Sequence, residues 1–148
     1  MALKNAKPSA RRRAREVALQ ALYAWRIQGG DALAHARNLE GWGQCEQGFA
    51  TRIVEDVVQK NDFLEGKIAP HLDRSLASVS PVERVILRIG AYELAERPET
   101  PFKVVLNEAI ELGKSFGGTD GHKFVNGVLE KLARELRAEE IARVRQAV

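Results

Sequence analysis

Cysteine, histidine and long apolar runs are scarce in this chain of 148 residues. The single cysteine, Cys45, cannot form an internal disulfide, and the three histidines are too far apart in sequence for zinc-ligand spacing. No stretch approaches the roughly 18 apolar residues of a membrane-spanning helix, and the N-terminal residues lack the apolar segment of a signal peptide. We therefore expect a cytoplasmic protein with no membrane segment, no metal and no cofactor.

Patterns of common catalytic sites are also missing. The tripeptide 113–115, Gly-Lys-Ser, lacks the first glycine of a phosphate-binding loop, because Glu108 stands at that position. The glycine-rich segment 117–121 follows a predicted helix, whereas dinucleotide-binding loops follow a strand. Glu108 and Glu111 have no partner base or metal ligand near them in sequence. These patterns favour a protein that is not an enzyme.

Apolar residues recur at every third or fourth position, and no segment alternates between polar and apolar residues. This pattern predicts an all-α protein of about seven helices, packed as bundles and separated by glycine, proline or capping residues. Ser80-Pro81-Val82-Glu83 has the composition of a capping box, in which Ser80 and Glu83 cap each other's backbone amides. The expected helices cover about residues 9–28, 32–40, 49–66, 68–76, 80–97, 101–116 and 120–136, with fraying beyond.

The expected organisation is a flexible basic arm, residues 1–8, followed by a single all-α domain, residues 9–148. Within this domain the glycine break and the short segment near residues 66 to 80 separate an N-terminal bundle of about 9–76 from a C-terminal bundle of about 80–138. We treat the two bundles as halves of one domain, because neither half is long enough to build a large core of its own.

Positive charge is concentrated at the N-terminus. Six basic residues precede the first acid, Glu16, so the rest of the chain carries a net charge of −3 within a total of +3. The last four of them, Arg11, Arg12, Arg13 and Arg15, lead directly into an amphipathic helix. A basic run alone is as often a solvated tail, but an arginine-rich face beside an aromatic ring suits the phosphates and bases of unpaired nucleic acid.

The helix that follows the arginines has two faces at 100° per residue. We expect Arg12, Glu16, Leu19 and Tyr23 to lie on the side opposite the core, with Gln20 available to bond base edges. The expected core side comprises Ala14, Val17, Ala18, Ala21 and Trp25.

A second candidate site begins the last long helix. Asp120 is the expected cap of this helix, and His122, Lys123 and Phe124 follow in its first turn. A positive charge, free backbone amides and an aromatic ring at a helix N-terminus suit a phosphate and a stacked base. The alternative is that Phe124 belongs to the core, and helical periodicity permits both positions.

Three stretches together resemble one family. RRRAREVALQALYAW (11–25), SPVERVILRIGAYEL (80–94) and PFKVVLNEAIELGKSFGGTDGHKFVNGVLEKLA (101–133) are similar, in this order, to the bacterial transcription antitermination factor NusB family. The resemblance implies two packed three-helix bundles. It also implies binding of single-stranded boxA RNA from ribosomal RNA leader transcripts, together with NusE, a small-subunit ribosomal protein. Other Nus factors and RNA polymerase are the further partners implied.

The resemblance also assigns roles to residues. The arginine run with Tyr23 matches the family's RNA-contacting helix, and Lys123 with Phe124 matches a second RNA patch, with Asp120 on the acidic turn beside it. Glu83 matches a position on the ribosomal-protein side. We expect the fold to bring the two RNA patches together.

A helical adaptor or homodimer with an incidental basic arm is the alternative function. Some members of the family are homodimers, and Leu19 beside Tyr23 on the off-core face suits such an interface. A dimer formed through that face would hide the predicted RNA site. The mass of the protein in solution, with and without RNA, distinguishes the two functions.

Overall fold

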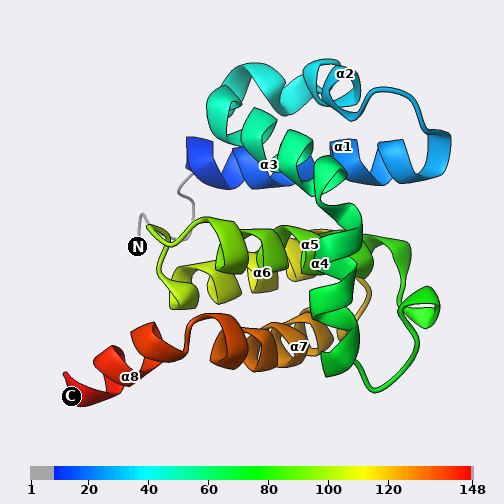
Figure 1. The fold of residues 1–148 in the computed structure, drawn as a ribbon. Coiled ribbons are helices and arrows are strands. Elements are labelled where there is room, and N and C mark those ends of the chain that lie inside the picture. Colours follow the sequence, from blue (N-terminus) through cyan, green and yellow to red (C-terminus); the bar gives the residue numbers. More distant parts are fainter. Residues whose placement is uncertain (1–8, 148) are drawn as a thin grey trace. The chain divides into compact units, whose positions relative to one another are not determined.

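The computed structural model describes residues 9–147, and within this range every regular element is helical. The all-α prediction is confirmed (Figure 1). The chain divides into two compact units, one ending at Val58 and the other beginning at Gln59. The predicted flexible arm, residues 1–8, lies outside the described residues. No helix of the described range is long and apolar enough to cross a membrane.

Three α-helices and one 3-10 turn form the N-terminal unit: α1 (Ala10–Gln28), α2 (Ala32–Arg37), η2 (Glu40–Gln44) and α3 (Gln47–Gln59). Ser9 caps α1, since its hydroxyl accepts a hydrogen bond from the Arg12 amide at 3.0 Å. Gly29 and Gly30 then end the helix with φ angles of +73° and +79°, a backbone region that favours glycine. Both ends of the first predicted helix are therefore confirmed.

The core of the N-terminal unit differs in part from the helical-wheel prediction. Leu19 is 2% exposed, so it does not belong to an exposed face of α1, and the predicted dimer seam of Leu19 and Tyr23 is wrong in this respect. Trp25, placed in the core by its spacing, is only half-buried. The buried apolar residues of the two long helices are Ala14, Val17, Ala18, Leu19, Ala21, Leu22, Phe49, Ala50, Ile53, Val54 and Val57.

The C-terminal unit is built around α5. Ten consecutive residues of this helix, from Val85 to Leu94, are buried. Gly90 lets α7 approach closely, because a Cβ at this position would lie 2.6 Å from the Leu129 side chain. The elements of the unit are α4 (Asn61–Ile68), η3 (Ala69–His71), η4 (Leu76–Ser78), α5 (Pro81–Glu96), α6 (Phe102–Phe116), α7 (Gly121–Leu136) and α8 (Ala138–Gln146).

The predicted helix over 49–66 is two helices that break at Lys60, which has φ −103° and ψ 19°. The described residues therefore form eight α-helices instead of about seven, and the boundary between the units precedes the expected break near 66 to 80. The second helix, α4, belongs with α5, because Glu65 pairs with the buried Arg88. The two turns expected over 68–76 are the separate 3-10 turns η3 and η4.

The capping box at the start of α5 forms only in part. The Ser80 hydroxyl accepts a hydrogen bond from the Glu83 amide at 3.3 Å, as predicted. The Glu83 carboxylate, however, accepts from the Gly118 amide at 3.4 Å, across the turn between α6 and α7. Glu83 therefore connects the beginning of α5 to this turn instead of capping its own helix.

The charged C-terminal segment is helical and attached to the unit, so the expected fraying after Leu136 is wrong. Arg137 is buried and donates hydrogen bonds to the carbonyl oxygens of Leu94 at 2.8 Å and Thr100 at 3.0 Å. Its partner Glu140 accepts from the Phe102 amide at 2.8 Å. This pair satisfies backbone groups that the end of α5 and the start of α6 leave without helical partners, and it thereby anchors α8.

Candidate nucleic-acid interface

The arginine run of α1 is held partly by its own unit. Arg11 pairs with Glu46 at 3.2 Å, and its guanidinium lies 3.9 Å from the centroid of the Phe49 ring. Arg13 donates to the side-chain oxygen of Gln44 at 3.2 Å. These contacts fix the two side chains against the segment 44–49 and reduce the charge that they offer to a ligand.

Arg15 is not part of the accessible surface. Arg15 is 3% exposed, and its guanidinium lies 5.1 Å from the centroid of the same Phe49 ring. A guanidinium in this position packs against an aromatic ring of α3. This burial corrects the expectation that all four arginines face RNA.

The accessible side of α1 carries residues at helical spacing. Arg12, Gln20 and Tyr23 lie within one stripe, with Glu16 between them. Gln20 is exposed, while Arg12 and Tyr23 are half-buried. The Gln20 amide donates to the Glu16 carbonyl at 3.3 Å, a local bond that a ligand can replace. We define Arg12, Gln20 and Tyr23 as the α1 patch.

The second candidate site lies at the start of α7. Lys123 pairs with Asp120 at 3.4 Å, and both side chains are 73% exposed. His122 is half-buried, because α6 approaches it so closely that a Cβ on Gly113 would lie 2.7 Å from its Cα. The first turn of α7 is thus fixed against α6, while Lys123 extends into solvent.

Phe124 has a partner that the sequence pattern did not indicate. The Arg74 guanidinium, from the segment between η3 and η4, lies 4.6 Å from the centroid of the Phe124 ring. The ring is half-buried instead of being enclosed in the core, which answers the question left open by periodicity. Arg74, Lys123 and Phe124 form the α7 patch.

Arg74 itself is paired with a neighbouring acid. Its Nε lies 2.8 Å from an Asp73 carboxylate oxygen. The hydrogen bond from Arg74 and its positive charge hold the pKa of Asp73 below the ordinary value of 3.8, and the same pair raises the pKa of Arg74. Both groups are therefore charged at neutral pH. No periodic signal marks Arg74, because its contact with Phe124 joins residues far apart in an irregular segment and a helix.

Glu83, predicted to face a protein partner, is half-buried against the turn 117–121. Its carboxylate accepts from the Gly118 amide, and a Cβ on Gly121 would lie 2.5 Å from one of its oxygens. Glycine at 121 therefore makes room for the Glu83 carboxylate. The role of Glu83 toward a partner stays a prediction.

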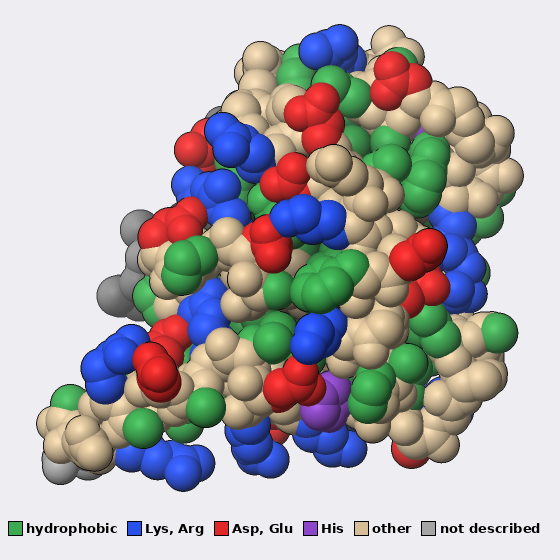
Figure 2. Space-filling model, in the orientation of Figure 1, with side chains coloured by type: hydrophobic (Ala, Val, Ile, Leu, Met, Phe, Trp, Pro, Cys, Tyr) green, Lys and Arg blue, Asp and Glu red, His purple; other side chains and the backbone are tan. Residues whose placement is uncertain are grey.

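Charges of both signs are interspersed over the molecular face shown in Figure 2. Within residues 9–147, no three His, Cys, Asp or Glu side chains are grouped so that they could hold a metal ion. The Cys45 thiol donates to the Trp42 carbonyl at 3.3 Å, and burial raises its pKa, which lowers the fraction of reactive thiolate. The α1 patch lies in one unit and the α7 patch in the other, so their union in one site also stays a prediction.

The comparisons with known proteins agree with this architecture. The sequence profile of the NusB family matches residues 12–134. The chain is 46% identical to the transcription antitermination protein NusB of Dechloromonas aromatica, over 94% of this chain and 87% of that one. It is 48% identical to the NusB protein of Thiobacillus denitrificans, over 88% of this chain and 92% of that protein.

Solved structures show the same fold. T. maritima NusB superposes with a TM-score of 0.78 at 28% identity, over 88% of this chain and 94% of that chain. A chain from the crystal structure of the antitermination factors NusB and NusE in complex with dsRNA superposes with a TM-score of 0.76 at 25% identity, over 85% of this chain and 97% of that chain. The match to the family profile and to these relatives shows that this chain belongs to the NusB family of transcription antitermination proteins.

Proposed function

We propose that this protein is a non-catalytic antitermination factor that binds single-stranded boxA RNA of ribosomal RNA leader transcripts in the cytoplasm. The observation that carries the proposal is the α7 patch, where the half-buried Phe124 ring contacts the Arg74 guanidinium and directly follows the exposed Lys123 in the first turn of α7. Rings of this kind stack unpaired bases, and the cations beside them attract phosphates. The names of the relatives support the role in antitermination.

NusE is the proposed protein partner, and a related solved complex that contains NusB, NusE and RNA supports this choice. In this proposal Glu83 contributes to the side that contacts NusE, whereas Tyr23 would contact protein only in the alternative homodimer. The acidic body of the chain is a suitable surface for a basic ribosomal protein. Other Nus factors and RNA polymerase would then assemble with this complex.

We propose separate roles for the polar and aromatic groups of the two patches. Arg12, Lys123 and Arg74 neutralise phosphates, with Arg11 and Arg13 contributing after they leave their present partners. Tyr23 and Phe124 stack bases, while Gln20 bonds a base edge. His122 supports the first turn of α7. Asp120 holds Lys123 in an ion pair until an RNA phosphate takes the place of the Asp120 carboxylate.

A titration with RNA tests the function directly. The full chain is mixed with a boxA-like single strand, a scrambled strand of equal length and a duplex of the boxA-like sequence, each with and without NusE. We expect the boxA-like single strand to bind most tightly and NusE to increase its affinity. Equal binding of the boxA-like and scrambled strands, or tightest binding of the duplex, contradicts the proposal.

The α1 patch has a matched pair of variants. Arg12→Ala should lower the affinity and reduce the slope of log affinity against log salt by about 0.7, the value for one lost phosphate contact on a single strand. Arg26→Ala, at an exposed position in the last turn of the same helix, serves as the control. An unchanged slope in the Arg12 variant removes that residue from the site.

Homodimerisation is the remaining alternative, and it is measured in the same samples. Light scattering coupled to size exclusion gives the mass of the chain with and without boxA-like RNA. A dimer that shares the α1 patch dissociates when RNA binds, whereas a chain that is monomeric throughout excludes this alternative at the concentrations used.

A further inference from the structure

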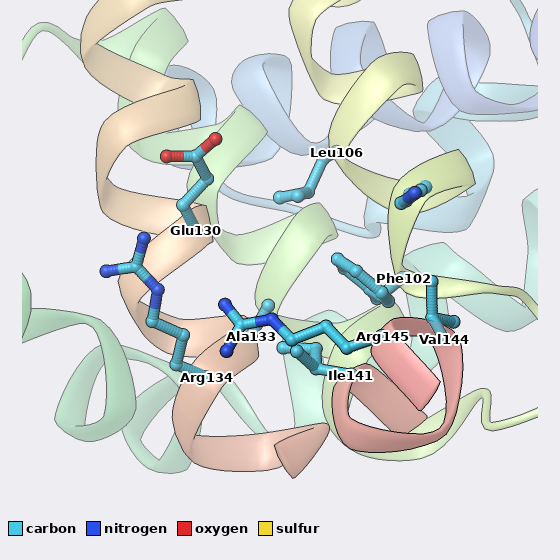
Figure 3. A pocket seen from close by; sticks show the side chains of 9 residues that line it. Phe102, Leu106, Glu130, Ala133, Arg134, Ile141, Val144 and Arg145 are labelled. Atoms are coloured by element: carbon cyan, nitrogen blue, oxygen red, sulfur yellow. The ribbon is translucent and has the colours of Figure 1, made fainter. Parts of the chain in front are cut away.

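A groove opens between α6, α7 and α8 of the C-terminal unit, and none of its lining residues is assigned to RNA. Its volume is about 250 Å³. Figure 3 shows Glu130 and Arg134 on one side of it, Phe102 and Val144 on the other, and Arg145 between them. Ile141, Val144 and Arg145 lie beyond residues 12–134, the part that the family profile matches. The residues that line the groove are Phe102, Lys103, Leu106, Glu130, Ala133, Arg134, Ile141, Val144 and Arg145.

The floor and walls of the groove are apolar and fixed in place. Leu106 and Ala133 are buried, while Phe102, Ile141 and Val144 are half-buried and leave apolar surface facing the groove. The position of α8 is set by the buried Arg137 and by the bond from the Phe102 amide to Glu140. Because these contacts exist without a ligand, binding would require little reorganisation of the walls.

The charges around the apolar floor are mainly positive. Lys103, Arg134 and Arg145 are exposed, and none of them forms an ion pair with another residue in the range 9–147 that the structure covers. Glu130 is the one acid among the lining residues, and its carboxylate accepts from Asn126 at 3.4 Å. Elsewhere in the unit, Lys67 and Lys123 are paired with acids.

We infer that this groove binds a short segment of another protein that carries an apolar anchor side chain flanked by Asp or Glu residues. A volume of this size is below that of sites for drug-sized ligands and suits one or two side chains of a peptide. The three exposed cations around it complement carboxylates on either side of the anchor. Arginine and aromatic residues, both present here, are enriched in the central contacts of protein interfaces.

Two other occupants fit the groove less well. RNA would use the three cations but would leave the aliphatic side chains of the groove, Leu106, Ile141 and Val144, without a partner, because bases stack on aromatic rings. The chain's own N-terminal segment carries Lys4 and Lys7 and no acid, so its charge is positive like that of the groove, and the two repel each other. An acidic peptide with an apolar anchor matches both properties of the groove.

The test is selection of ligands from a library of random 12-residue peptides displayed on phage, with the full chain as bait. We expect the selected peptides to contain an apolar residue, Leu, Ile, Phe or Trp, flanked by acids. Each is then synthesised with a fluorescent label and titrated against the wild type and against the double variant Arg134→Glu/Arg145→Glu. The expected loss of affinity in this variant is on the order of tenfold or more, because two attractive charges become repulsive.

Lys131→Glu/Arg143→Glu is the matched control, since it makes the same charge change at exposed positions of α7 and α8 that do not line the groove. Both variants are first compared with the wild type by thermal unfolding, and Ile141→Ser provides a second groove variant without a charge change. Selected peptides without acids, or equal loss in both double variants, overturn the proposal.

Two further outcomes would assign the groove to another occupant. Loss of boxA-like RNA affinity in the Arg134→Glu/Arg145→Glu variant, with an unchanged affinity in the single variant Arg143→Glu, shows that RNA is the ligand. A change from dimer to monomer in the same variant shows that a second copy of the chain fills the groove. Either result overturns the inference of an acidic peptide, whereas the peptide selection and titration do not depend on whether the chain binds boxA RNA.

Discussion

The α1 patch and the α7 patch both combine basic side chains with an aromatic ring, but their charges are held in different ways. Around α1, the basic run is long and much of it is used for packing: Arg11 and Arg15 lie over one phenylalanine ring, and Arg15 is buried. In the α7 patch two cations are available, and each is paired with an adjacent acid, Asp73 or Asp120.

This difference shows that the number of basic residues in a sequence does not by itself determine the positive charge exposed on the surface. Arginine has a long apolar stem and a planar cation, so it can pack on an aromatic ring as well as bind phosphate. The longest basic run therefore contributes to packing in the N-terminal unit, whereas the two cations of the α7 patch are exposed and each pairs with an adjacent acid. Four substitutions test this distinction.

The largest effect is expected from Arg15→Ala. Removal of a buried guanidinium that packs on Phe49 should lower the free energy of unfolding by about 2–4 kcal/mol, since both the contact and the packing of the side-chain stem are lost. Chemical denaturation measures this change. RNA affinity, measured at a temperature well below the midpoint of thermal unfolding, should stay within about twofold of the wild type, because Arg15 does not reach the surface.

Arg26→Ala is the control for this prediction, since Arg26 is an exposed arginine of the same helix. It should change stability by less than about 0.5 kcal/mol. If Arg15→Ala is as stable as the wild type and loses RNA affinity, Arg15 is a ligand contact and the distinction between the patches fails.

The second effect in size is expected from Phe124→Ala. Loss of a stacked base should weaken boxA-like RNA binding by about 1–3 kcal/mol, with little change in the salt slope because no charge is removed. Fluorescence anisotropy at several salt concentrations measures both quantities. Phe116→Ala removes another partly exposed phenylalanine, at the end of α6, and should leave binding unchanged. Equal losses in the two variants contradict stacking at Phe124.

Sequence patterns sufficed for the parts of this molecule that are set locally. The all-α class, the Ser9 cap, the glycine end of α1 and the start of α5 all follow from contacts within a few residues. The family resemblance was also confirmed. The local features among these are determined by residues only a few positions away in the sequence.

Features that depend on distant residues could not be obtained in this way. No glycine or proline marks the break at Lys60, and α4 is separated from α3 by its contacts with α5. The burial of Arg15 depends on Phe49, and the Arg74 to Phe124 contact spans 50 positions. The helix of the C-terminal segment depends on carbonyl groups that only the folded α5 presents to Arg137.

Arg74→Ala should have a smaller effect than Phe124→Ala. Arg74 lies on the ring, so its loss removes one cation and leaves the ring freer to move. We expect about a threefold loss of RNA affinity, within the range measured for exposed charge pairs, and a salt slope reduced by about 0.7. Arg143→Ala, which removes an exposed charge of α8, is the control. A gain of affinity in the Arg74 variant would mean that Arg74 competes with the base for the ring.

The smallest effect is expected from Asp73→Asn. Removal of this carboxylate releases Arg74 from its ion pair and eliminates a negative charge that would repel the RNA phosphates. RNA affinity should therefore rise by about twofold at neutral pH. Asn keeps the size of the side chain, so a change in affinity reports the charge.

The pH dependence of this gain has a definite sign. Because Arg74 lowers the pKa of Asp73 below 3.8, the stabilising pair is fully present above that value and is lost only as the pH falls through the lowered pKa. The ratio of variant to wild-type affinity should therefore stay constant from about pH 8 to pH 5, where both proteins are measured by anisotropy with the same RNA. A ratio that falls toward one within this window would show that Asp73 is already protonated there. The ion pair between Asp73 and Arg74 would then be too weak to reduce the positive charge that Arg74 offers to RNA.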